Sequence, residues 1–207
     1  MNLKKLINAE KTFMKQYPGG FRHPDIAAIG RKHKMDEMTL LTQESFAKKN
    51  FRDPGTIIHN MTKIISRSSM VSLFEKPKFK RFADSLFLKD RELLASGLKK
   101  QLYGKQQEGF EIVLDILKRG KLAKWSLITI CPAYFRPQID VFVKPTTAKG
   151  VIEFFELKSL QYNPTPSWDF YDEYRAIINE MKTRVDPSLS PSNAAFSGFL
   201  MMSLESR

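Results

Sequence analysis

The chain has 207 residues, of which 42% are hydrophobic and 12% aromatic; this excludes a wholly disordered protein and suffices for one sizeable core. The net charge of +12 is uneven: residues 1–104 carry 21 Lys and Arg against 10 Asp and Glu, and residues 105–207 carry 13 against 12. The single cysteine excludes an internal disulfide.

The chain shows neither the apolar stretch of a signal peptide nor an apolar run of the roughly 18 residues that suggest a membrane span. We therefore expect a soluble, cytoplasmic protein with no membrane partner. The sequence does not indicate an oligomeric state.

Apolar residues recur at three- and four-residue spacing through most of the first 120 positions, which is the period of a helix. Together with residues that favour helix ends, this spacing predicts helices over 3–16, from His23-Pro24-Asp25, from Asp36 to Ala47, from Asp53-Pro54 through Ile65, over 76–86, from Asp90 to Gly104, and over 110–120. The expected fold class is mainly α, a multi-helix globular bundle.

The pattern changes after Lys121. The segment WSLITICPAYF fits either a strand or a buried helix ending at Pro132, and QIDVFVK alternates as a strand does. We therefore allow at most one or two short strands near 138–144. A helix over 171–181 and the buried closing segment AAFSGFLMMSL complete the chain. It is either a single domain or a basic helical half, 1–104, packed on a more apolar half, 105–207.

Three segments of the C-terminal third carry a resemblance: KPTTAKGVIEFFEL, YNPTPSWDFYDEY and DPSLSPSNAAFSGFL. They resemble the closing part of uncharacterised bacterial proteins that share a K-P-x-x-T/A helix start and a Y-x-P-x-P-x-x-x-x-Y loop. That group has no assigned activity, so the resemblance implies no catalytic residue. It does imply a helix after Pro145.

Asp140, Glu156 and Lys158 suggest one alternative function. An Asp at the end of one strand and a Glu-x-Lys on the next resemble the PD-(D/E)xK nucleases, in which two carboxylates bind Mg²⁺ and the lysine acts on the attacking water. A strand would place Glu156 and Lys158 on one face, with Glu111 as a further acid. A helix would point them about 200° apart. Thr146 or Thr147 as a helix cap favours the helix, whereas Gly150 weakens it.

A helix beginning here also permits a DNA-reading unit. Lys144, Thr146, Thr147 and Lys149 would then stand at its N-terminus, where a phosphate gains from backbone N–H groups. An ordinary capped core helix explains the same residues.

The leading hypothesis rests on two basic clusters in the N-terminal half. They comprise Arg31, Lys32 and Lys34, and Lys76, Lys78, Lys80 and Arg81. Such clusters create a local positive field that attracts nucleic acid or an acidic protein, although solvated helix faces also carry lysines. We expect a non-enzymatic binding protein that needs no cofactor, Mg²⁺ entering only under the nuclease alternative.

Several other features have structural explanations. Cys131 lies in an apolar run and is expected to be buried, and the three histidines do not have the spacing of a zinc site. The aromatic residues Trp168, Phe170, Tyr171 and Tyr174 could stack bases, but their helical spacing suits core packing. A third possibility is a structural subunit whose closing segment packs against another chain.

Overall fold

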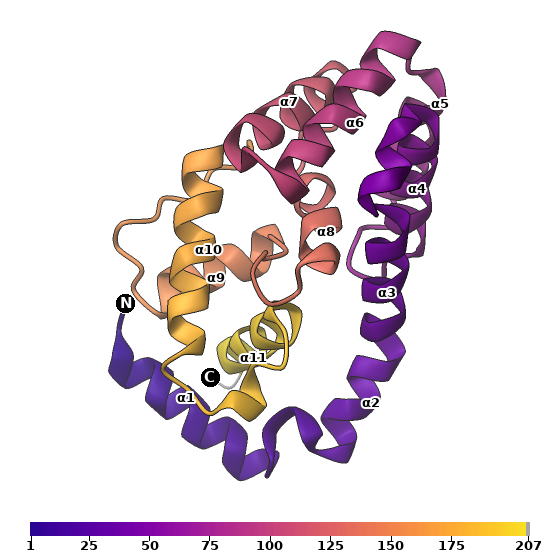
Figure 1. Ribbon diagram of the computed structural model, residues 1–207. Helices are drawn as coiled ribbons and strands as arrows, with labels where there is room; N and C mark the ends of the chain where they lie inside the picture. The colour runs from indigo at the N-terminus through magenta and orange to yellow at the C-terminus, as the bar shows by residue number, and fades with distance from the viewer. Residues whose placement is uncertain (206–207) are drawn as a thin grey trace.

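The computed structural model describes residues 1–205, the side chains as far as Leu204, and contains helices and no strand in that range (Figure 1). The mainly α prediction is confirmed. The helices are α1 (Leu3–Gln16), α2 (Pro24–His33), α3 (Met35–Ser45), α4 (Pro54–Arg67), α5 (Glu75–Ser85), α6 (Leu88–Tyr103), α7 (Gln106–Arg119), α8 (Trp125–Phe135), α9 (Pro145–Phe154), α10 (Trp168–Lys182) and α11 (Asn193–Glu205).

Helices α3, α4 and α5 form a layer along one edge of the molecule, with α2 below α3 in the view of Figure 1. Glu37 at the start of α3 pairs with Arg67 at the end of α4, and Asn60 in α4 bonds the Ser45 carbonyl at 2.9 Å, so these helices are antiparallel. The loop 68–74 then reverses the chain into α5. The layer presents one face to α8 and the other to solvent.

Several helix starts follow the chemistry of their first residues. The Asp53 carboxylate accepts hydrogen bonds from the Gly55 and Thr56 amides at 2.9 and 3.2 Å, as predicted for an N-cap. Asp36 and Asp90, expected as caps, instead lie in the first turns of α3 and α6. There a carboxylate still interacts favourably with the positive end of the helix dipole.

Helices α6 and α7 pack closely because glycine occupies the contact. A Cβ atom at Gly109 would lie 2.6 Å from the Gly97 carbonyl oxygen, and one at Gly97 would lie 2.7 Å from Ile112 Cγ2. The two backbones therefore approach to a distance that no side chain permits.

Helix α8 is buried along nearly its whole length and continues through Pro132 to Phe135. The strand alternative for WSLITICPAYF and the predicted end at Pro132 are therefore wrong. Proline removes one backbone hydrogen bond, but burial among α3, α4, α6 and α7 holds the helix together past that position.

The short strands that the sequence allowed near 138–144 do not form within residues 1–205. The next helix, α9, begins at Pro145 with Lys144 as its N-cap, so the predicted caps Thr146 and Thr147 lie inside its first turn. The helical interpretation of residues 147–154 is confirmed.

One cluster of buried apolar residues extends from Leu6 in α1 to Leu200 in α11 and includes side chains on both sides of Gly104. The core is thus continuous across Gly104. The division into residues 1–104 and 105–207 describes a difference in net charge. Helix α11 packs against α9, α1 and α10. Phe196, Phe199 and Leu200 are fully buried, as expected of a closing segment, and they are buried within this chain.

Among residues 1–205, no helix combines the length and apolar character needed to cross a bilayer.

We predict that Gly109→Ala lowers the free energy of unfolding by about 1–3 kcal/mol or more, because the new methyl group meets backbone atoms that cannot move aside. Gly30→Ala in α2 is the matched control, since its Cβ atom would meet nothing within 4 Å. The free energy of unfolding of that variant should rise by about 0.4–1 kcal/mol, because alanine restricts the conformations of the unfolded chain. Urea titration of both variants tests the prediction, and equal stabilities would contradict the close α6–α7 contact.

Candidate binding surface

The first basic cluster lies where α2 ends and α3 begins. Arg31 and Lys32 are exposed in the last turn of α2, and Lys34 joins the two helices with a left-handed backbone (φ 51°). Lys34 Nζ lies 3.8 Å from a Glu37 carboxylate oxygen, a loose and exposed pair. Such pairs contribute little, so most of the positive charge of this cluster remains available.

The second basic cluster occupies α5. Lys78, Lys80 and Arg81 are exposed, and Lys76 is half-buried. Lys80 pairs with Asp84 one turn later at 2.7 Å. Among the described side chains, those of residues 1–204, Lys76, Lys78 and Arg81 form no ion pair, so their charge is not compensated locally.

The structure connects the first cluster to the loop that leads into the second. His33 lies within the first cluster, and its Nδ1 atom is 2.8 Å from Ser69 Oγ in the loop that leads into α5. Because α3 and α5 start at the same end of α4, Lys34 and Lys76 both lie near that end. Both basic clusters are thus found at the same end of the α3–α4–α5 layer.

A groove of about 380 Å³ continues this surface between α4 and α5. Its charged or titratable lining residues are His59, Lys63, Lys80, Arg91 and one acid, Asp84. Lys63 and Arg91 were not among the predicted contact residues. Lys63 could have been identified from the sequence, because it follows His59 by four residues and therefore lies on the same polar face of α4.

The nuclease residues have other roles in the structure. Asp140 is 1% exposed, and its carboxylate accepts hydrogen bonds from Arg136 Nε at 2.6 Å and from Arg175 Nη1 and the Tyr171 hydroxyl at 3.1 Å. Two guanidinium groups therefore already neutralise it. Burial, and next the Asp140 charge, raise the pKa of the Tyr171 hydroxyl well above its ordinary value, so the hydroxyl stays protonated and donates.

The charge cluster around Asp140 joins four segments of the chain: the loop 136–144, α6, α7 and α10. Arg136 also donates to the Gln101 and Leu102 carbonyl oxygens at the end of α6, each at 3.1 Å. Arg175 in α10 donates to Gln106 Oε1 at the start of α7 at 2.7 Å. The role of this cluster in the structure is to hold helix ends together.

Glu156 and Lys158 lie in a different environment. Both are exposed, beyond the end of α9, and Glu156 has a left-handed backbone (φ 55°). The hydrogen bond and charge of Lys5, at 2.9 Å, together with a hydrogen bond from Asn2, lower the pKa of the Glu156 carboxyl. Paired strands, on which the nuclease geometry depends, do not occur in residues 1–205, so Asp140, Glu156 and Lys158 are not arranged as that alternative requires. Glu111, its further acid, is an exposed residue of α7.

The DNA-reading alternative also lacks the expected geometry. Residues 136–144 separate α8 from α9, whereas a helix-turn-helix unit has a turn of about three to four residues. Lys149 stacks over the Tyr162 ring at 5.0 Å, and the opposite face of α9 is buried through Ala148 and Val151. Helix α9 is therefore a core helix with an exposed, polar first turn.

The remaining predicted structural residues lie as expected. Phe170, Tyr171 and Tyr174 are buried and stack with Phe110 and with each other, so core packing of the aromatic cluster is confirmed. Cys131 is 1% exposed, and burial raises the pKa of its thiol to about 12. His23 caps α2 by accepting the Asp25 amide hydrogen bond at 3.4 Å.

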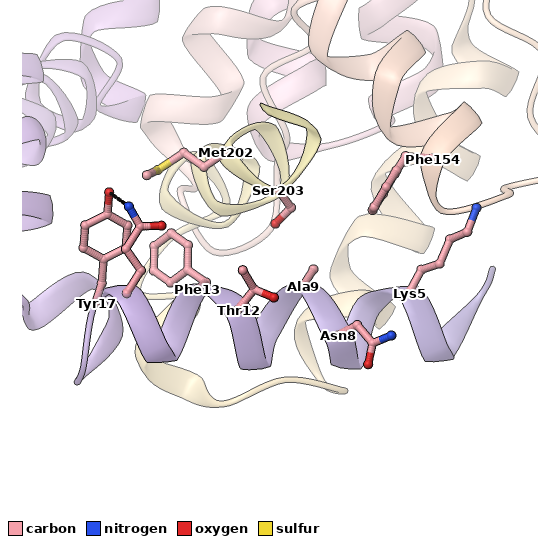
Figure 2. Close-up of a pocket in the computed structure, with 10 residues that line it drawn as sticks. Lys5, Asn8, Ala9, Thr12, Phe13, Tyr17, Phe154, Met202 and Ser203 are labelled. Carbon is pink, nitrogen blue, oxygen red and sulfur yellow. Dashed lines mark hydrogen bonds between the residues drawn. The ribbon is translucent and has the colours of Figure 1, made fainter. Parts of the chain in front are cut away.

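A second groove, of about 360 Å³, lies between α1 and α11 (Figure 2). Figure 2 shows Lys5, Thr12 and Tyr17 along α1, facing Met202 and Ser203 of α11. The Lys5 ammonium pairs with Glu156, and Ser203 Oγ donates to the Phe199 carbonyl oxygen at 2.9 Å. The lining thus presents neither a base next to a nucleophile nor an accumulation of charge.

Comparisons with protein-family models, with curated proteins and with solved structures found no match to this chain.

We predict that Asp140→Asn lowers the free energy of unfolding by about 3–5 kcal/mol, because it leaves two largely buried guanidinium groups without a counter-charge. Glu156→Gln is the control and should change stability far less, since its pair with Lys5 is exposed. Thermal and urea unfolding of both variants measure the difference. Equal effects would show that the charge cluster does not stabilise the fold.

We predict that native protein at pH 8 reacts very slowly with iodoacetamide, because a thiol with a pKa of about 12 is almost wholly protonated and is also inaccessible. The same protein in denaturant should be labelled stoichiometrically at Cys131. Mass spectrometry measures both rates, and fast labelling of the native protein would contradict the buried position.

Proposed function

We propose that the protein is a non-enzymatic binding protein that contacts nucleic acid through its basic N-terminal half. The observation that carries this proposal is the His33–Ser69 contact. It joins the first cluster, Arg31 to Lys34, to the loop that leads into α5, which carries the second cluster, Lys76 to Arg81. The cationic groove between α4 and α5 extends the same surface.

The arrangement of charge supports a polyanion as the ligand. Residues 1–104 have a net charge of +11, with 21 Lys and Arg against 10 Asp and Glu, and Glu37 and Asp84 in this region are paired with Arg67 and Lys80. A track of unpaired cations can replace counterions along a phosphate backbone, which is the main source of affinity for nucleic acid. An acidic protein is the other outcome of the experiment below.

We predict that Lys78→Glu combined with Arg81→Glu weakens binding to a labelled oligonucleotide and makes binding less salt-dependent. Removal of one phosphate interaction should reduce the slope of log affinity against log salt by about 0.7–0.9. Fluorescence anisotropy at several salt concentrations measures both effects.

The matched control reverses two exposed charges in the C-terminal half, Lys144→Glu and Lys158→Glu, so the net charge changes equally. It should leave most of the affinity and the slope unchanged. Equal losses of affinity in both double variants would show that binding depends on net charge alone. This result would overturn the proposed binding site on α5. Absence of binding to any DNA or RNA would overturn nucleic acid as the ligand. Binding of an acidic protein to the same surface would then identify that class of ligand instead.

A further inference from the structure

Helix α5 is flanked by the most exposed large apolar side chains in the part of the chain whose side chains are described. Leu73 and Phe74 precede it and are 78% and 81% exposed; Phe87 and Leu88 follow it and are 82% and 70% exposed. Single exposed apolar residues are common on protein surfaces, but two adjacent pairs on either side of one basic helix are a pattern that indicates a ligand.

Phe74 shares one face of α5 with the unpaired cations. Its backbone is helical (φ −78°, ψ −27°), so it extends the register of the helix by one residue. Phe74, Lys78, Arg81 and Ser85 then follow at spacings of four, three and four, which places them on a single stripe. All four are exposed, while Phe79 and Ala83 on the other face are buried. We call these four residues the α5 stripe.

Acidic residues near the α5 stripe are already engaged. Glu75 accepts a hydrogen bond from Ser126 at 2.7 Å, Asp84 pairs with Lys80 at 2.7 Å, and Asp90 pairs with Arg119 at 2.5 Å. Lys78 and Arg81 thus keep their positive charge, and in the chain they lie between two exposed aromatic residues, Phe74 and Phe87. Helix α5, which lies between these two residues, is about 16 Å long at 1.5 Å per residue.

Resting on the proposed function, we propose that the α5 stripe and Phe87 bind single-stranded nucleic acid, with bases stacked on Phe74 and Phe87 and phosphates on Lys78 and Arg81. An unpaired strand offers phosphates and free base faces in alternation, which matches cations lying between two rings. In a duplex the base faces are covered by neighbouring base pairs and cannot reach the rings. A membrane surface would favour one continuous apolar face, whereas α5 separates its apolar ends by charge.

The experiment compares a labelled single strand of about 12 nucleotides, a length within the usual range for such sites, with a duplex of the same length. The single strand should bind more tightly. Phe74→Ala and Phe87→Ala should each weaken its binding by about 5- to 150-fold, the loss typical of one base–aromatic stack, and should change duplex binding little. Both side chains are more than 80% exposed, so the variants are expected to fold, which urea titration checks.

Two further substitutions separate stacking from apolar contact. Phe74→Leu keeps an apolar side chain but removes the ring, so its affinity for the single strand should be as low as that of Phe74→Ala. Phe74→Trp keeps a ring, and it should retain binding and show fluorescence quenched by the single strand but not by inorganic phosphate. Full binding of the single strand by Phe74→Leu would overturn stacking on the Phe74 ring.

The remaining outcomes distinguish this inference from the proposed function. Equal binding of duplex and single strand, both insensitive to the Phe variants but weakened by Lys78→Glu with Arg81→Glu, would overturn the inference and leave the proposed function standing. No binding to either would overturn both. Binding to phosphatidylserine-containing vesicles that depends on Phe74, without oligonucleotide binding, would assign the surface to a membrane and also overturn both.

Discussion

The buried carboxylate of Asp140, held between Arg136 and Arg175, is the interaction on which the C-terminal part of the structure depends. Transfer of a charge out of water costs several kcal/mol unless the group is paired and its hydrogen bonds are satisfied. Here both carboxylate oxygens have donors, and both guanidinium groups have further acceptors at the ends of α6 and α7 and within α10. Removal of the carboxylate would leave both guanidinium groups without a counter-charge, so four segments of the chain depend on one side chain.

Side chains next to the same cluster explain how Asp140, Val141 and Val143 can be buried although their segment forms no strand. Backbone groups inside a protein need partners, and here side chains provide them. Thr129 Oγ1 accepts from the Val143 amide at 3.1 Å, and Asn179 and Asn193 donate to the carbonyl oxygens of Ile139 and Asp140 at 2.9 and 3.2 Å. Two asparagines and one threonine therefore replace the hydrogen bonds that a neighbouring strand provides in a sheet. Charged groups engaged in this way are not free for chemistry, whereas the cations of the α3–α4–α5 layer remain exposed to solvent.

Most helices could be predicted from the sequence because their signals are local: apolar residues at helical spacing in α4 and α10, and the cap that Asp53 gives to α4. The alternation in QIDVFVK allowed a strand at 138–144 that does not form, because alternation alone does not specify a partner strand. Val141 and Val143 are buried, but Ile139 is 51% exposed. Helix α8 continues past Pro132 because tertiary burial outweighs one lost hydrogen bond. The basic clusters were visible in the sequence, but their junction was not, because the His33–Ser69 contact joins positions 36 apart. The exposure of Phe74 and Phe87 could not be predicted from the sequence either, since an aromatic residue is usually assigned to a core.

The position of α11 also bears on how the chain folds as it is synthesised. Phe199 packs edge-on against Phe13 of α1 at 5.3 Å between ring centroids, and the Asn2 amide donates to the Phe155 carbonyl oxygen at 2.7 Å. Helix α1 is synthesised long before α11 but has no complete partner until residues 193–205 exist. Contacts between such distant positions form late and slowly, and an unpaired apolar helix is prone to aggregation in the interval. Nascent chains that end before α11 should therefore be natural clients for chaperones that shield exposed apolar helices.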